Sequence, residues 1–116
     1  MQRDVQAFLW DVRTSVLDIQ TFVAGMDLST YLANSMAQAA VERKFEIIGE
    51  ALNQLAKLDQ TIASRITDVP RIVAFRNQLI HGYASVKVDT VWAVVQKSLP
   101  ILLDQTNALL DELNSR

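Results

Sequence analysis

Apolar residues recur at helical spacing along most of the chain. In residues 5–23 they follow the i, i+3, i+4, i+7 rule, and the same spacing returns in residues 35–55 and 86–113. No segment alternates apolar and polar residues as a half-buried strand does. The pattern therefore predicts an all-α protein with three long helices.

Glycine and capping residues set the boundaries in the first half of the chain. Gly25 ends the first helix, Asp27 caps a short turn over residues 28–33, and Ser35 begins the second long helix. Gly49 in the middle of that helix costs about 1 kcal/mol relative to alanine. Close approach of another backbone would explain why a glycine stands there.

Proline organises the second half of the chain. Residues 58–69 are mixed and predict a short helix with loops. Pro70 suits the first turn of a short helix that stops at Gly82. Pro100 lies inside the last long helix and should kink or split it, because it removes one backbone donor.

These elements predict an antiparallel up-and-down bundle of four to five helices. The chain has 116 residues, so we expect one domain over residues 1–116. Half of the residues are apolar, more than a small helical protein can bury alone, so we expect a homodimer. No apolar run is long enough to span a membrane, and no signal peptide opens the chain, so we expect a cytoplasmic protein.

Charge is unevenly distributed along the chain. The net charge is −2, which argues against generic nucleic-acid binding. Residues 62–98, however, carry five Lys or Arg against two Asp or Glu, a net charge of +3, and they contain the only histidine. Such a local positive region suits engagement of a polyanion or an acidic partner. Ordinary charge scatter is the alternative. The chain has no cysteine, so disulfides and zinc–thiolate sites are excluded.

Four polar residues able to do chemistry fall within eight positions. Asn77 and His81 are four positions apart, so they share one face of a helix. Arg76 is next to that face and reaches it with a long side chain. Gly82 lets the chain leave the helix, so that Tyr83 turns back toward His81.

This group suits RNA cleavage by attack of a 2′-hydroxyl on the adjacent phosphate, without a metal or cofactor. Histidine serves as base or acid, and the arginine fork matches two phosphate oxygens. Asn77 orients the histidine or the phosphate. The reaction needs two proton-transfer groups, and a twofold dimer supplies them by bringing two copies of Arg76 and His81 to one cleft. Water or Tyr83 are alternatives for the second group.

Structural explanations compete with these roles. A lone histidine at a helix end is more often a capping or surface residue. Arg43, Glu46 and Glu50 form a polar stripe on the second long helix. Such a stripe is usually an ion-paired surface, and the alternative is that it lines the cleft and holds Arg76 or His81 in place.

The motif Arg76-Asn77-x3-His81-Gly82-Tyr83 resembles the Arg-x4-His-x-Tyr signature of the HepT-like toxins. These form a minimal branch of the HEPN (higher eukaryote and prokaryote nucleotide-binding) superfamily. Residues 40–51 resemble the family's second long helix, with its Ile-Gly-Glu-Ala run, and Val91-Trp92 and Leu99-Pro100 also lie where the family tends to have them. Lys87 departs from the family, in which an acidic residue often caps the last helix.

The resemblance implies a dimeric, HEPN-like helical domain with a composite, metal-independent endoribonuclease site. Arg76 and His81 would be its catalytic pair and Asn77 a supporting residue. The implied partner is a minimal nucleotidyltransferase antitoxin that transfers AMP from ATP to Tyr83. We therefore expect the toxin of a toxin–antitoxin system, with RNA as substrate. The alternatives are a non-catalytic regulatory subunit of a nucleotidyltransferase, or a structural helical dimer whose polar motif fills an interface.

Overall fold

The computed structural model describes residues 4–82 and 86–115, which form six helices and no strand. In chain order they are α1 (Val5–Phe22), α2 (Leu28–Leu32), α3 (Ser35–Leu58), α4 (Gln60–Ala63), α5 (Val69–His81) and α6 (Val88–Asn114). The all-α class is therefore confirmed. Four of the helices have seven or more residues, within the predicted four to five. α4, with 4 residues, is the short helix predicted within residues 58–69, and α2, with 5 residues, stands where only a short turn was predicted. No helix in this part of the chain has the length and apolar character that crossing a membrane requires.

Capping side chains begin the first helices where the sequence predicts. Asp4 accepts a hydrogen bond from the Ala7 backbone N–H at 2.8 Å. Asp27 and Thr30 form a reciprocal capping box, in which the Thr30 N–H donates to Asp27 Oδ1 at 2.8 Å and the Asp27 N–H donates to Thr30 Oγ1 at 2.9 Å. Gly25 follows α1 at φ +79°, a left-handed conformation that glycine adopts without strain. The predicted cap at Asp27 is therefore confirmed, whereas α1 ends at Phe22, with Val23 as its C-cap, three residues before Gly25.

The last long helix differs from its prediction at its start and near its middle. α6 begins at Val88, two residues after the predicted start, and Lys87 at its N-cap makes no side-chain capping hydrogen bond. The helix continues unbroken through Pro100, so of the two predicted effects, a kink or a split, the split is wrong. Pro100 is exposed, as is Gln96, whose carbonyl lacks the donor that the proline removes, so water can satisfy that carbonyl.

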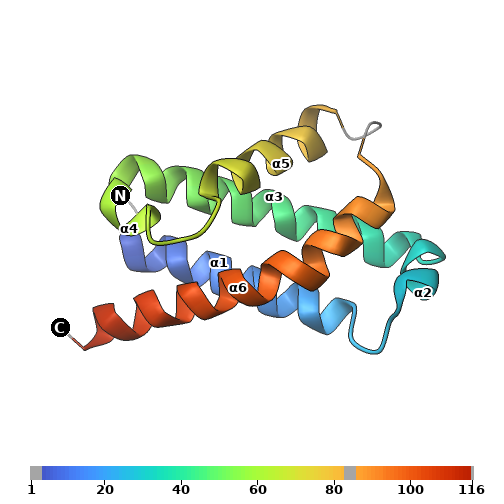
Figure 1. Cartoon of the computed structure of the whole chain (residues 1–116), viewed down its shortest axis with the longest axis horizontal. Coiled ribbons are helices and arrows are strands. Elements are labelled where there is room, and N and C mark those ends of the chain that lie inside the picture. Colours follow the sequence, from blue (N-terminus) through green and yellow to red (C-terminus); the bar gives the residue numbers. More distant parts are fainter. Residues whose placement is uncertain (1–3, 83–85, 116) are drawn as a thin grey trace.

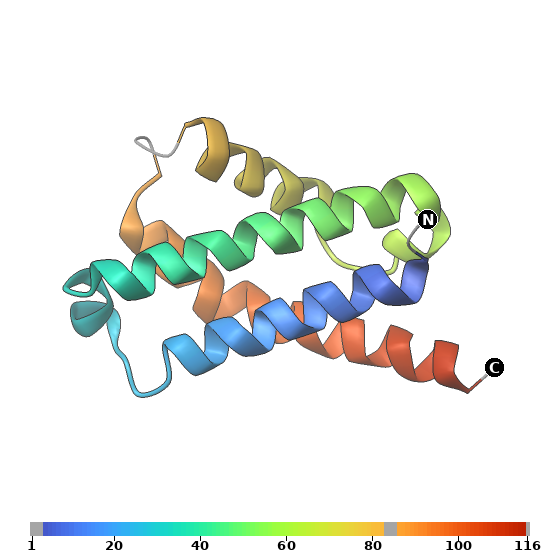
Figure 2. The same ribbon diagram turned by 180° about the vertical axis from the view of Figure 1, so that it is seen from behind.

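Helices α1, α3, α5 and α6 run alternately in opposite directions along the length of the molecule, as an up-and-down bundle does (Figure 1). α3 packs against α1 on one side and α5 on the other, whereas α6 packs against α1 and α2. Figure 2 shows α1 and α3 side by side from behind. The start of α1 meets the end of α6, where Gln6 Nε2 donates to Asn114 Oδ1 at 2.6 Å. α5 thus rests on α3 at one edge of the bundle.

The apolar stripes of α1, α3 and α6 form the core between them. Its fully or almost fully buried members include Leu9, Val12, Val16, Ile19, Val41, Phe45, Ile48, Leu52, Leu55 and Leu99. Tyr31 of α2 closes one end of this core by packing on Trp92, with ring centroids 4.9 Å apart. Burial of the hydroxyl raises the pKa of Tyr31 to about 12. The core therefore lies beneath α5 and leaves the outer face of that helix exposed.

Candidate active site

α5 carries the residues that the sequence singles out, and local chemistry sets both of its ends. Asp68 precedes the helix at φ +60°, and Pro70 lies in the first turn, where no backbone donor is needed. The helix ends at His81, and the Gly82 N–H closes its last turn on the Gln78 carbonyl at 2.8 Å. The predicted short helix, from Pro70 in its first turn to Gly82 after its end, is confirmed.

Arg76 lies against α3 at the one position where that helix has no side chain. A Cβ added to Gly49 would lie 2.2 Å from Arg76 Cβ and 2.6 Å from its Cγ, far below a normal contact. The mid-helix glycine therefore admits a neighbour closely, as predicted. The nearest atoms belong to the aliphatic stem of the arginine, so the prediction that another backbone would approach is wrong.

The guanidinium of Arg76 is held by two further residues. Its Nη2 lies 3.0 Å from Glu50 Oε2 in a salt bridge, and its Nη1 donates to Asn77 Oδ1 at 2.8 Å. Its Nε is buried and has no hydrogen-bond partner among the described residues. The side chain as a whole is 24% exposed, so its contacts fix it without sealing it from solvent. Arg76 is thus positioned before any substrate arrives.

A cleft of about 300 Å³ opens beside Arg76, where α1, α3 and α5 meet. It is lined by Phe8, Asp11, Arg43, Glu46, Ile47, Glu50, Ala51, Arg76 and Ile80. The predicted stripe of Arg43, Glu46 and Glu50 therefore does line a cleft. It also forms the surface ion pair that was the alternative, because Arg43 Nη1 lies 3.2 Å from Glu46 Oε2.

Negative charge gathers along the α3 side of this cleft. Glu42, Glu46 and Glu50 follow one another at four-residue spacing, so they lie on one face of the helix. Burial, and then the charge of Glu46, raise the pKa of Glu42. Arg76 and Arg43 therefore sit in an acidic setting, where a cationic side chain is stabilised.

The remaining motif residues lie on the outer face of α5. Asn77 and His81 are both exposed, and His81 does not line the cleft beside Arg76. The predicted convergence is therefore confirmed for Arg76 with Asn77. Within the described part of the chain, Arg43 and Glu50 form their ion pairs with Glu46 and Arg76, not with His81. Tyr83, the predicted site of AMP transfer, lies outside the described residues.

Sequence reasoning missed the contributions of α1 and of one residue of α5 to this cleft. Phe8 and Asp11 of α1 form one wall, and Ile80 extends the wall that Arg76 begins. The position of Ile80 four residues after Arg76 was a usable sign, because such pairs share a helix face. Nothing in the sequence indicated which turn of α1 would lie opposite. Across residues 4–82 and 86–115, no group of three or more His, Cys, Asp or Glu side chains is placed to bind one metal ion.

The fold and the site together define an all-helical protein with a positioned arginine and an exposed histidine on one short helix. The family model described as "Ribonuclease HepT-like" matches residues 12–109 of this chain. The chain belongs to the HepT-like ribonuclease family.

Several named relatives agree with this assignment. "Putative RNase MJ1380" of Methanocaldococcus jannaschii is 34% identical over 85% of this chain and 90% of that protein. "Putative RNase MJ0125" of the same organism is 29% identical over 99% of this chain and 98% of that protein. "Probable ribonuclease HepT" of Thermococcus cleftensis is 30% identical over 88% of this chain and 92% of that protein. No solved structure is significantly similar to this chain.

Proposed function

We propose that this protein is a metal-independent endoribonuclease and the toxin of a toxin–antitoxin pair. The observation that carries the proposal is the fixed position of the Arg76 side chain. Its stem rests on Gly49, and its guanidinium is oriented by Glu50 and Asn77. An arginine held in place beside an open cleft is suited to bind a phosphate that gains charge during reaction. The family membership and the names of the relatives support the same activity.

In the proposed reaction a 2′-hydroxyl of the RNA attacks the neighbouring phosphate and releases the 5′-oxygen of the next nucleotide. His81 takes or delivers a proton, and Arg76 neutralises the phosphorane. His81 is the last residue of α5 and is exposed, so its side chain is accessible to a bound strand. Asn77 supports the site by accepting from Arg76 Nη1 at 2.8 Å.

The proposed site is completed by a second copy of the chain. One histidine per chain leaves one of the two proton transfers without a group, and a twofold axis near α5 would add a second His81 and a second Arg76. An exposed apolar side chain supports an interface on this side, since Ile80 at the cleft is 37% exposed.

We further propose that a partner nucleotidyltransferase silences the site by transferring AMP to Tyr83. Tyr83 follows His81 by two residues, so the added group would lie beside the histidine. An adenylyl group brings bulk and negative charge, and both oppose the approach of an RNA phosphate to Arg76.

The test is RNA cleavage by the purified full chain in the presence of a metal chelator. Wild-type protein is expected to cut, and His81→Ala is expected to lose activity while its helix content and oligomeric state stay unchanged. Gln60→Ala, an exposed change on α4, is the matched control and should cut like wild type. Equal activity of wild type and His81→Ala would overturn the assignment.

A second function, a non-catalytic regulatory subunit of a nucleotidyltransferase, has one observation in its favour. Both terminal nitrogens of Arg76 already have partners within the chain, as they would in a purely structural ion pair. This function predicts a stable complex with the nucleotidyltransferase, no RNA cleavage, and no growth defect when the chain is expressed alone.

A further inference from the structure

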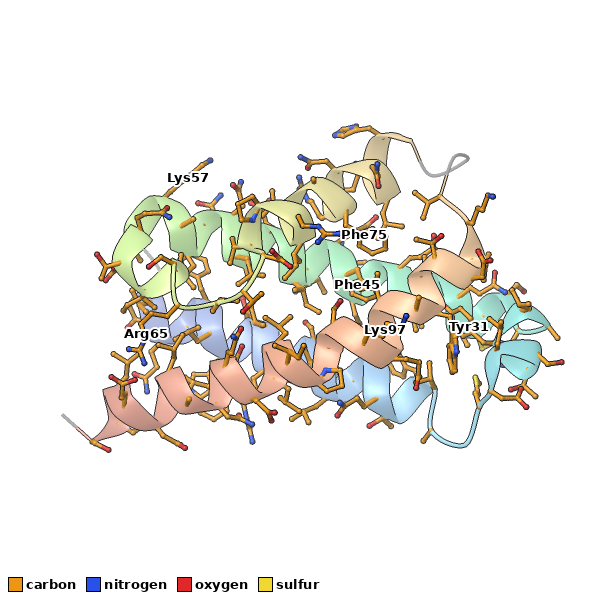
Figure 3. The ribbon with its side chains drawn as sticks, in the orientation of Figure 1. Tyr31, Phe45, Lys57, Arg65, Phe75 and Lys97 are labelled. Carbon is orange, nitrogen blue, oxygen red and sulfur yellow. The ribbon has the colours of Figure 1, made fainter. Side chains whose placement is uncertain are left out.

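A second cavity, larger than the cleft beside Arg76, lies between α5 and α6. Its volume is about 420 Å³, within the range of roughly 300–1,000 Å³ typical of small-molecule sites. It exists because α5 packs on α3 while α6 packs on α1 and α2, so the two helices diverge. Figure 3 shows Phe45 and Phe75 in the space between them.

The floor of this cavity is aromatic and aliphatic. Phe45 of α3 and Phe75 of α5 meet edge to face, with ring centroids 5.2 Å apart at an interplanar angle of 90°. Ile72, Val94, Leu99 and Leu102 surround the two rings. Phe45 is 2% exposed, whereas Phe75 is only partly buried. A flat apolar ligand can therefore reach an aromatic surface here.

The rim of the cavity offers hydrogen-bonding groups and positive charge. Gln78, Thr90 and Ser98 line it, and none of their side chains makes a hydrogen bond to another residue in the described part of the chain. Arg71 and Asp68 also line the rim. Arg71 is 84% exposed, and its Nη1 lies 3.6 Å from Asp68 Oδ2, its one ion pair among the described residues, so the guanidinium remains open to a ligand. Lys97 stands next to Ser98 on α6 (Figure 3). A ligand with a flat apolar face, polar edges and a negative charge fits this arrangement.

The cavity and His81 border the same exposed strip of α5. Gln78 and His81 are three residues apart, so they are neighbours on the helix surface, and both are exposed. The rise between them is about 4.5 Å along the helix axis, which is shorter than the length of one nucleotide in an extended strand. A strand whose phosphate lies at His81 would therefore carry an adjacent base past Gln78 to the cavity.

We propose that the cavity between α5 and α6 binds an unpaired base of single-stranded RNA, next to the phosphate that is cut. The base packs on Phe75, Gln78 and Ser98 contact its edge, and Arg71 and Lys97 contact the flanking phosphates. Stacking on aromatic side chains is the common means of holding single-stranded bases. The inference rests on the proposed ribonuclease function and extends it to where the substrate strand runs.

Binding can be tested without cleavage, using hexanucleotides of one base each whose 2′-hydroxyls are methylated. Their affinity for the full chain is measured by fluorescence anisotropy at one fixed salt concentration. Ser98→Leu places a branched side chain in the cavity at an exposed position, so it should fold. Ala108→Leu makes the matched addition elsewhere on α6, at an exposed position that does not line the cavity.

Ser98→Leu is expected to weaken binding of at least one hexamer by about fivefold or more, with Ala108→Leu within about twofold of wild type. An abasic hexamer should bind weakly and equally to all three proteins. Equal affinity of Ser98→Leu and wild type for every hexamer would overturn the proposal. So would an equal loss with the abasic hexamer, because the cavity region would then bind only phosphate.

Two further outcomes separate this proposal from the proposed function. If wild type binds bases through the cavity but leaves unmodified RNA intact, the ribonuclease function fails and base binding stands. If Ser98→Leu cuts unmodified RNA as wild type does, the function stands and the base site is wrong.

Thr90→Val, in which the new side chain is nearly equal in shape, gives a second variant at the rim, and it too is expected to weaken binding of the hexamers. If Ser98→Leu changes the dimer equilibrium instead of RNA affinity, a second copy of the chain occupies the cavity, and the proposal is wrong.

Discussion

Arg76 and His81 lie on one short helix, yet they differ in how the rest of the chain holds their side chains. Arg76 rests on Gly49, pairs with Glu50 and donates to Asn77, whereas His81 is an exposed residue in the last turn. The arginine is therefore positioned by a single chain. The histidine is presented outward, as expected if a second chain completes the site. One chain therefore suffices to position Arg76, whereas in our proposal the dimer completes the site around His81.

Gly49→Ala should have the largest effect on stability, because it removes the space in which Arg76 lies. The new methyl group would collide with Arg76 Cβ and Cγ, so α5 must shift away from α3. We expect a loss of about 2–3 kcal/mol in the free energy of unfolding, measured by urea denaturation.

Gly25→Ala is the control for that change. Gly25 has open space around it but a φ of +79°, so alanine there should cost only about 1 kcal/mol through backbone strain. If Gly49→Ala is no more destabilising than Gly25→Ala, the close packing of Arg76 on α3 is not rigid.

Arg76→Ala and His81→Ala should differ in stability although both should abolish cleavage. Arg76→Ala loses a packed stem and a partly exposed salt bridge, about 1 kcal/mol in total. His81→Ala changes an exposed residue, so its effect should be within about 0.5 kcal/mol. Thermal unfolding followed by circular dichroism measures both. An equal loss for the two variants would show that His81 has contacts as firm as those of Arg76.

Glu42→Gln should have the smallest effect, and its sign tests the acidic face of α3. Burial and the charge of Glu46 raise the pKa of Glu42, so stability is lost as pH rises through the folded-state pKa. Glutamine avoids that loss. We therefore expect Glu42→Gln to unfold at a higher temperature than wild type at pH 7, with a difference that shrinks as pH falls toward 4. Asp104→Asn, an exposed change on α6, should show no such rise, and a gain that persists at low pH would contradict burial and charge repulsion as the cause.

Local chemistry made the helices themselves predictable, whereas their placement relative to one another could not be predicted. Asp27, Gly25 and Pro70 act within a few residues of themselves, so the sequence indicates their turns and caps directly. Gly49 indicated a close contact but not its partner, because that depends on how α5 packs across α3. The cavity between α5 and α6 could not be predicted for the same reason: it results from the divergence of two helices, and no residue pattern records that angle.

Which apolar residues are exposed also could not be predicted from the sequence. Trp10 fits the apolar stripe of α1 as well as its buried neighbour Leu9 does, yet it is 43% exposed, with the Arg13 guanidinium carbon 5.1 Å from its ring centroid. Periodicity identifies a stripe but not its edges, because the width of the covered face depends on the neighbouring helices.

The most direct test of the account is the activity of mixed dimers. Wild-type and His81→Ala chains are refolded together at equal amounts and fixed total concentration, and RNA cleavage is measured. If each cleft needs His81 from both chains, only wild-type homodimers cut, and about one quarter of the full activity remains. If each chain works alone, about one half remains, and the proposed composite site is wrong.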